Sequence, residues 1–263
     1  MSIIIWAIII SFLILMIYKL VQSNKPWLSN IYYEDFKSLS ELELKYAKRG
    51  TCNTSIIEYN SDNKTINKIY AWFPSELQYN NKKYPMIVVV NASNTRAKDY
   101  KPFFDRLASW GFIVLGNDDP QTGKGKTTSI TLDYIMNKVD DGVLQGKIDT
   151  EKIGIIGYSQ GGAGAINAIT RYDNGKMYKA IFTGSAPYAL LSKNLGWEYD
   201  ISKIEIPYFM IGGTGWTDDT GNYGEKEFSG VCPLFSLIEN YNGIVADAFK
   251  IRGQLLKLNM KIY

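Results

Sequence analysis

The fold is decided by the stretch Ile153-Gly154-Ile155-Ile156-Gly157-Tyr158-Ser159-Gln160-Gly161-Gly162-Ala163. Its first four residues predict a strand buried on both faces. The small residues from Gly161 onward predict the start of a helix. Between them, the Gly-x-Ser-x-Gly pattern leaves room for a serine on a sharp turn from strand to helix. The sequence therefore predicts a nucleophile elbow that lifts the Ser159 hydroxyl above the sheet edge and points the helix N-terminus at a developing oxyanion.

Apolar runs and amphipathic segments alternate on both sides of this stretch. Strands are predicted at residues 55–59, 66–73, 86–90, 112–115, 153–156, 180–182 and 208–211. Helices are predicted at residues 99–110, 132–139 and 163–170, with a later helix at 234–241 and a last strand at 248–252. Alternation of this kind implies βαβ crossovers. The predicted fold class is α/β, with a mostly parallel sheet flanked by helices.

The N-terminus has a different character. Residues 3–18 form an uncharged, apolar run, which Leu20 and Val21 extend past Lys19. A run of about 20 apolar residues is long enough to span a bilayer. A cleaved signal peptide is less favoured because no basic residue precedes the run and no small-x-small site follows it, and a buried core helix is the least favoured. We therefore expect a retained, single-pass transmembrane helix, whose orientation Lys19 and Lys25 are too few to decide.

These patterns divide the chain into three parts. Residues 1–21 are predicted to be the membrane anchor, 22–51 a polar linker with an amphipathic entry segment, and 52–263 the α/β domain. The expected localisation is a membrane, reached through residues 3–21.

Composition excludes several classes of function. The net charge is only +3 and no basic block stands out, so nucleic-acid binding is not favoured. The sequence contains no histidine and two cysteines, Cys52 and Cys232. Two free thiols are favoured over one long-range bridge. Because histidine and paired cysteines supply most zinc and iron sites, no metal or other cofactor is expected.

Four segments, in this order and spacing, resemble the α/β-hydrolase superfamily and, within it, the cutinase-like and polyester-hydrolase-like branch that is related to dienelactone hydrolases. The segments are residues 88–93, 106–112, 157–162 and 206–212. The resemblance covers about residues 52–252 and implies an α/β-hydrolase fold. It also implies a serine esterase that acts on carboxylic esters, either small molecules or lipid-like ones.

The resemblance assigns roles residue by residue. Ser159 matches the nucleophile, and the backbone N–H groups of Gln160 and Ser93 match the two oxyanion donors. Asp218 matches the acid that orients the base, with Asp219 as a close rival. The alternative for both aspartates is a solvated turn.

The family places its base histidine in a loop after the last strand, and this chain has none. The resemblance therefore implies that the domain of residues 52–263 is incomplete at its C-terminus. Lys124, Lys126 or Lys250 could replace the base, although their spacing singles out none of them. Two functions stay open: an impaired serine hydrolase, or an inactive pseudo-hydrolase that serves as a membrane-tethered binding or structural protein. The sequence leaves the oligomeric state open.

Overall fold

The computed structural model describes residues 2–23, 40–138, 142–187 and 189–211. Within them, seven strands form one sheet in the order β1-β2-β4-β3-β5-β6-β7. The strands are β1 (Thr54–Asn60), β2 (Lys68–Pro74), β3 (Tyr84–Val90), β4 (Ile113–Asn117), β5 (Ile148–Tyr158), β6 (Ala180–Gly184) and β7 (Tyr208–Ile211). Strand β2 runs antiparallel to β1 and β4, while all pairs from β4 to β7 are parallel. The predicted α/β class with a mostly parallel sheet is confirmed.

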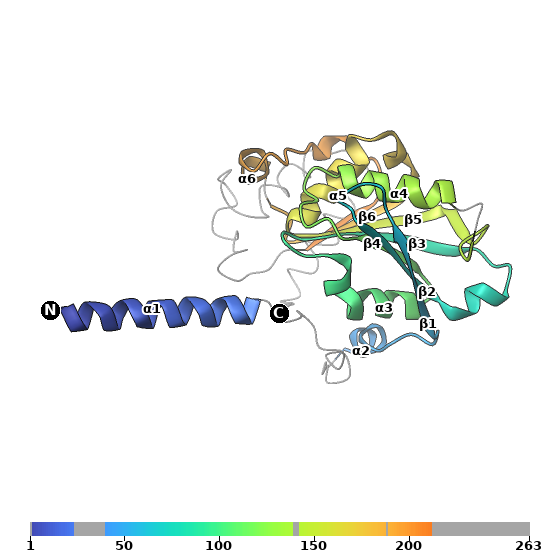
Figure 1. The fold of residues 1–263 in the computed structure, drawn as a ribbon. Helices are drawn as coiled ribbons and strands as arrows, with labels where there is room; N and C mark the ends of the chain where they lie inside the picture. The colour runs from blue at the N-terminus through green and yellow to red at the C-terminus, as the bar shows by residue number, and fades with distance from the viewer. Residues whose placement is uncertain (1, 24–39, 139–141, 188, 212–263) are drawn as a thin grey trace.

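Helices cover both faces of this sheet (Figure 1). One face carries α4 (Lys126–Lys138), α5 (Gln160–Thr170) and α6 (Ala189–Asn194), and the other carries α3 (Lys101–Ser109) and α2 (Glu41–Ala47). Short 3-10 turns lie at η1 (Ser75–Tyr79), η2 (Ala97–Tyr100), η3 (Asp173–Met177) and η4 (Ile201–Lys203). Helix α3 connects β3 to β4, which lies on one side of β3 in the sheet, while α4 connects β4 to β5, on the other side of β3, and α5 connects β5 to β6. Because crossovers between parallel strands are right-handed, a crossover in the reverse direction places its helix on the opposite face of the sheet.

Two hydrophobic clusters follow from this layering. The larger one lies between the sheet and α4 and α5, and includes Met86, Val88 and Ile155. The smaller one lies between the sheet and α3, where the Trp72 ring meets Phe104 edge-on with 4.7 Å between ring centroids. Strand β3 contributes alternate side chains to both clusters, which explains its unbroken apolar sequence.

Two elements, β5 and α4, begin at least five residues before their predicted start. Strand β5 begins at Ile148, where it pairs with Tyr84, and not at Ile153. Its added residues include Thr150 and Glu151, whose exposed side chains carry no apolar signal. Helix α4 begins at Lys126, in a run of threonine and serine that favours caps and turns over helices. The helix predicted at 234–241 and the strand predicted at 248–252 lie outside the described residues.

The N-terminal run is helical, as α1 (Ser2–Ser23). Every described side chain of this helix, residues 5–18, is exposed. Among the described residues, no helix is both long and apolar enough to cross a membrane. The transmembrane helix predicted at residues 3–21 is thus not supported by the described helices, and membrane attachment stays a prediction.

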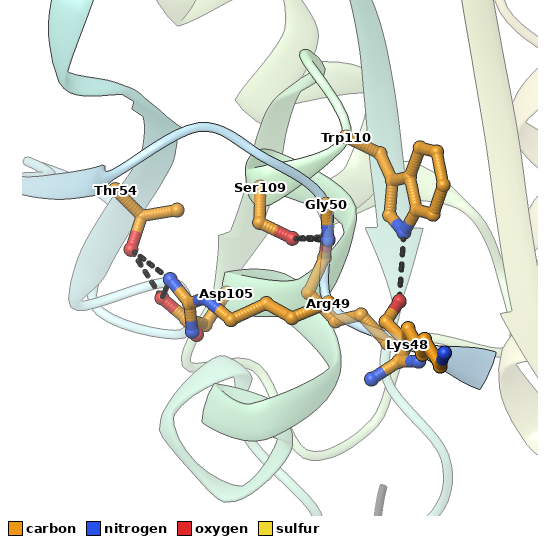
Figure 2. A network of polar contacts seen from close by, with 8 residues as sticks. Lys48, Arg49, Gly50, Thr54, Asp105, Ser109 and Trp110 are labelled. Atoms are coloured by element: carbon orange, nitrogen blue, oxygen red, sulfur yellow. Dashed lines mark hydrogen bonds and ion pairs between the residues drawn. The ribbon is translucent and has the colours of Figure 1, made fainter. Parts of the chain in front are cut away.

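The segment before β1 is held against α3 (Figure 2). The Gly50 N–H donates to the Ser109 hydroxyl at 2.9 Å, and the Trp110 ring N–H donates to the Lys48 carbonyl at 3.1 Å. The Arg49 guanidinium pairs with Asp105. A Cβ on Gly50 would lie 2.2 Å from the Ser109 carbonyl oxygen, so only glycine allows this close approach. Ordered packing therefore begins before residue 52, inside the segment predicted to be a linker.

Candidate active site

Ser159 lies in the sharp turn between β5 and α5. Its backbone has φ 52° and ψ −124°, a region that residues with a side chain rarely adopt. Its N–H donates to the Gly184 carbonyl at 2.9 Å, and its carbonyl accepts from the Gly162 N–H at 2.8 Å. These two bonds hold the strained serine in the geometry that a nucleophile elbow requires.

The glycines of the motif are required by packing. A Cβ on Gly157 would lie 2.1 Å from the Gly161 carbonyl oxygen, and a Cβ on Gly161 would lie 2.2 Å from the Val90 carbonyl oxygen. A Cβ on Gly162 would lie 2.6 Å from the Ala186 Cβ. The start of α5 is thus pressed onto the ends of β3 and β5, which is possible only without side chains.

Backbone strain gathers at the same edge of the sheet. Among the described residues, four other than glycine have positive φ: Asn67, Asn94, Ser159 and Ser185. Asn94 follows β3, Ser159 follows β5, and Ser185 follows β6, and these are neighbouring parallel strands. Concentrated strain is typical of functional sites. The carboxyl ends of β3, β5 and β6 are therefore the candidate site, and sequence reasoning missed Asn94 and Ser185 because no motif surrounds them.

The two predicted oxyanion donors lie on the loops of adjacent strands. Gln160 is the first residue of α5, so its N–H has no acceptor within the helix. In the loop after β3, the N–H groups of Ala92, Asn94 and Thr95 donate to Tyr100, Pro120 and Ala92, respectively. The Ser93 N–H donates to no group in the described part of the chain. Both predicted donors are thus available to an external acceptor.

A buried polar layer supports these loops. The Asn91 side-chain amide donates to the Asn117 and Asp119 carbonyls at 2.8 Å each. The Thr122 hydroxyl donates to the Asn91 carbonyl at 2.6 Å, and the Thr127 hydroxyl donates to the Asp119 carboxylate at 2.5 Å. All five side chains are buried. Buried polar groups with several partners rigidify the backbone that carries them.

Gln121 bridges the loops in a way that the sequence did not indicate. Its side-chain oxygen accepts from the Gln160 side-chain amide at 2.9 Å. Its own amide donates to the Asn94 side-chain oxygen at 3.1 Å. The bridge therefore joins the loops after β3, β4 and β5.

The predicted acid and the candidate bases are only partly covered by the structure. Asp218, Asp219 and Lys250 lie outside the described residues. Lys124 and Lys126 are exposed, and no hydrogen bond within the described part of the chain joins either side chain to Ser159. Within the described ranges, no group of three or more metal-binding side chains occurs. The proton acceptor for Ser159 is therefore not identified among the described residues.

A cavity of about 750 Å³ lies elsewhere. It is on the α3 side of the sheet, over β3, β5, β6 and β7, and its walls include Ile156, Phe182 and Phe209. Ser159, Gln160 and Ser93, the predicted site residues that the structure describes, do not line it. The cavity is therefore separate from the candidate site.

An elbow serine at the carboxyl edge of a mostly parallel sheet, with a helix directly behind it, defines the α/β-hydrolase class. The model of the PET hydrolase-like family matches residues 54–217, which is more than half of the chain. The chain belongs to this family of ester hydrolases, and the predicted polyester-hydrolase branch is confirmed. A search of curated proteins found no match.

Proposed function

We propose that the protein is a serine hydrolase of carboxylic esters in which Ser159 is the nucleophile. The observation that carries the proposal is the strained Ser159 backbone between β5 and α5, beside two N–H groups that have no acceptor among the described residues. The Ser159 oxygen would attack the acyl carbon, and the Gln160 and Ser93 N–H groups would hold the resulting oxyanion. Membership of the PET hydrolase-like family supports a carboxylic ester as the substrate, either a small molecule or a lipid-like one.

The reaction needs a base that accepts the Ser159 proton, because a serine hydroxyl is a weak nucleophile at neutral pH. The sequence has no histidine for this task. Asp218 is the proposed acid, and in this chain it has no imidazole to orient. When one member of the triad is missing, substrate binding and the oxyanion hole alone accelerate the reaction by roughly 10³- to 10⁴-fold over the reaction in water. We therefore expect slow turnover.

The same absence favours a second function. A chain that keeps the elbow and lacks its base can serve as a binding protein for esters or for other carbonyl compounds. The two functions share the fold and differ in whether the Ser159 hydroxyl is reactive.

A fluorophosphonate probe separates the two functions, because it phosphonylates only an activated serine. The hydrolase function predicts labelling of the full chain that disappears in Ser159→Ala and persists in Ser61→Ala, a serine in the β1–β2 turn. A folded protein without any labelling would support the binding function. Labelling that persists in Ser159→Ala would exclude Ser159 as the reactive group.

We also infer that residues 3–21 attach the protein to a membrane. The side chains of residues 5–18 are exposed, and all of them except Ser11 are apolar or aromatic. A helix that is apolar on every side favours lipid over water. The full chain should float with liposomes, and a chain lacking residues 2–23 should not. An intact chain that stays entirely in the aqueous fraction would contradict the attachment.

A further inference from the structure

We propose that Gln121 is a positioning residue that sets the spacing between the two oxyanion donors. The proposal rests on the proposed hydrolase function. It begins from the bridge of two hydrogen bonds that runs from Gln160 through Gln121 to Asn94. One end of the bridge is the side chain of the first donor, Gln160. The other end is Asn94, the residue directly after the second donor, Ser93.

The donors depend on such a link because different loops carry them. Strands β3 and β5 pair in parallel, with Val90 opposite Gly157, so their loops leave the sheet side by side. The Asn94 N–H donates to the Pro120 carbonyl at 3.0 Å, which ties the β3 loop to the β4 loop. The Gln121 side chain adds the tie from the β4 loop to the elbow. Through this bridge, side-chain hydrogen bonds connect the β3 loop with the β5 loop.

Gln121 is itself held at its backbone. Its N–H donates to the Asp119 carboxylate at 2.8 Å. The Asp119 side chain is only 1% exposed and also accepts from the Thr127 hydroxyl. Pro120 restricts the chain between these two residues. The backbone that carries the Gln121 amide is therefore fixed, although the side chain itself is exposed.

A glutamine suits this position chemically. Its amide oxygen accepts the hydrogen bond from Gln160, and its NH₂ group donates to Asn94. A glutamate could accept from Gln160 and could not donate to Asn94. Gln160 is buried, with 1% of its surface exposed, and its side-chain oxygen has no partner among the described residues. Its orientation thus depends on Gln121.

The spacing matters because oxyanion donors must lie about 2.7–3.1 Å from the oxygen in the transition state. A displacement of about 1 Å can lower a rate about a hundredfold. Loss of the bridge should loosen both loops while the buried layer keeps them folded. We therefore expect a defect in the chemical step and little change in binding.

Two measurements on the full chain test the proposal, with Gln121→Ala, Gln121→Glu and the control Gln145→Ala, an exposed glutamine in a distant turn. In Gln121→Ala, the rate constant of inactivation by the fluorophosphonate should fall about fivefold, while the inhibition constant, which measures binding of the probe, should stay unchanged. Gln121→Glu, which keeps one of the two bonds, should show a smaller decrease. Gln145→Ala should label like wild type.

Hydrogen–deuterium exchange of the same variants reads the bridge without any need for reactivity. The Asn94 and Gly162 amides should exchange faster in Gln121→Ala than in Gln145→Ala. Unchanged exchange at both amides overturns the bridge. Faster exchange with unchanged labelling overturns its role in positioning the donors. A wild-type chain that does not label contradicts the hydrolase function, and exchange then decides the bridge alone.

Discussion

The carboxyl ends of the parallel strands differ sharply from the rest of the sheet in this protein. At the carboxyl ends of β3, β5 and β6, three side-chain-bearing residues have positive φ, and the elbow glycines have no space for a Cβ. Toward the middle of β5 the backbone is ordinary, and a Cβ on Gly154 would meet only the Ala180 carbonyl oxygen, at 3.8 Å. One strand thus carries a strained end and a relaxed part. The strain belongs to the candidate site and not to the sheet.

The largest expected effect comes from adding one methyl group in each part of β5. Gly157→Ala places a Cβ 2.1 Å from the Gly161 carbonyl oxygen and should lower the free energy of unfolding by about 3 kcal/mol. Gly154→Ala fits and should raise it by about 0.5–1 kcal/mol, because glycine inside a strand costs that much relative to alanine. Urea denaturation of both variants measures the difference. Equal destabilisation would contradict the contrast within the strand.

Substitutions to glycine should have opposite effects at the strained ends and in the rest of the sheet. Ser159→Gly relieves the strained φ and should raise the free energy of unfolding by about 1 kcal/mol while it abolishes probe labelling. Ala180→Gly, in the neighbouring strand β6 opposite Gly154, should lower the free energy of unfolding by about 0.5–1 kcal/mol. Thermal unfolding is the measurement. Destabilisation by Ser159→Gly would show that the serine conformation is not strained.

The smallest effects are expected at two buried tyrosines beside β6. The Tyr208 hydroxyl shares a hydrogen bond of 2.8 Å with Thr183, near the carboxyl end of β6, so Tyr208→Phe should cost about 1 kcal/mol. Tyr178, just before β6, has a fully buried hydroxyl with no partner among the described residues. Tyr178→Phe should leave stability unchanged or raise it. Calorimetry of the two variants measures the difference. If both lost the same free energy of unfolding, the Tyr178 hydroxyl would have a hydrogen-bond partner.

The comparison also explains which features could be predicted from the sequence. The elbow at Ser159 and strand β3 have local signals, since a glycine motif and an apolar run follow from contacts within a few residues. The bridge through Gln121 has no such signal because its partners, Asn94 and Gln160, are far away in the sequence. The same holds for the contacts of residues 48–50 with α3, which only tertiary packing creates.

The close packing of Gly161 against the Val90 carbonyl also bears on the order of folding. The two residues belong to β3 and α5, which are separated in the chain by α3, β4, α4 and β5. The close packing that strains the elbow therefore forms only after β3 and α5 have come together. Contacts between residues so far apart in the sequence form slowly during folding. Strain acquired so late should speed unfolding and leave the folding rate almost unchanged. The strained serine then shortens the lifetime of the native state and does not change the time that the chain needs to fold.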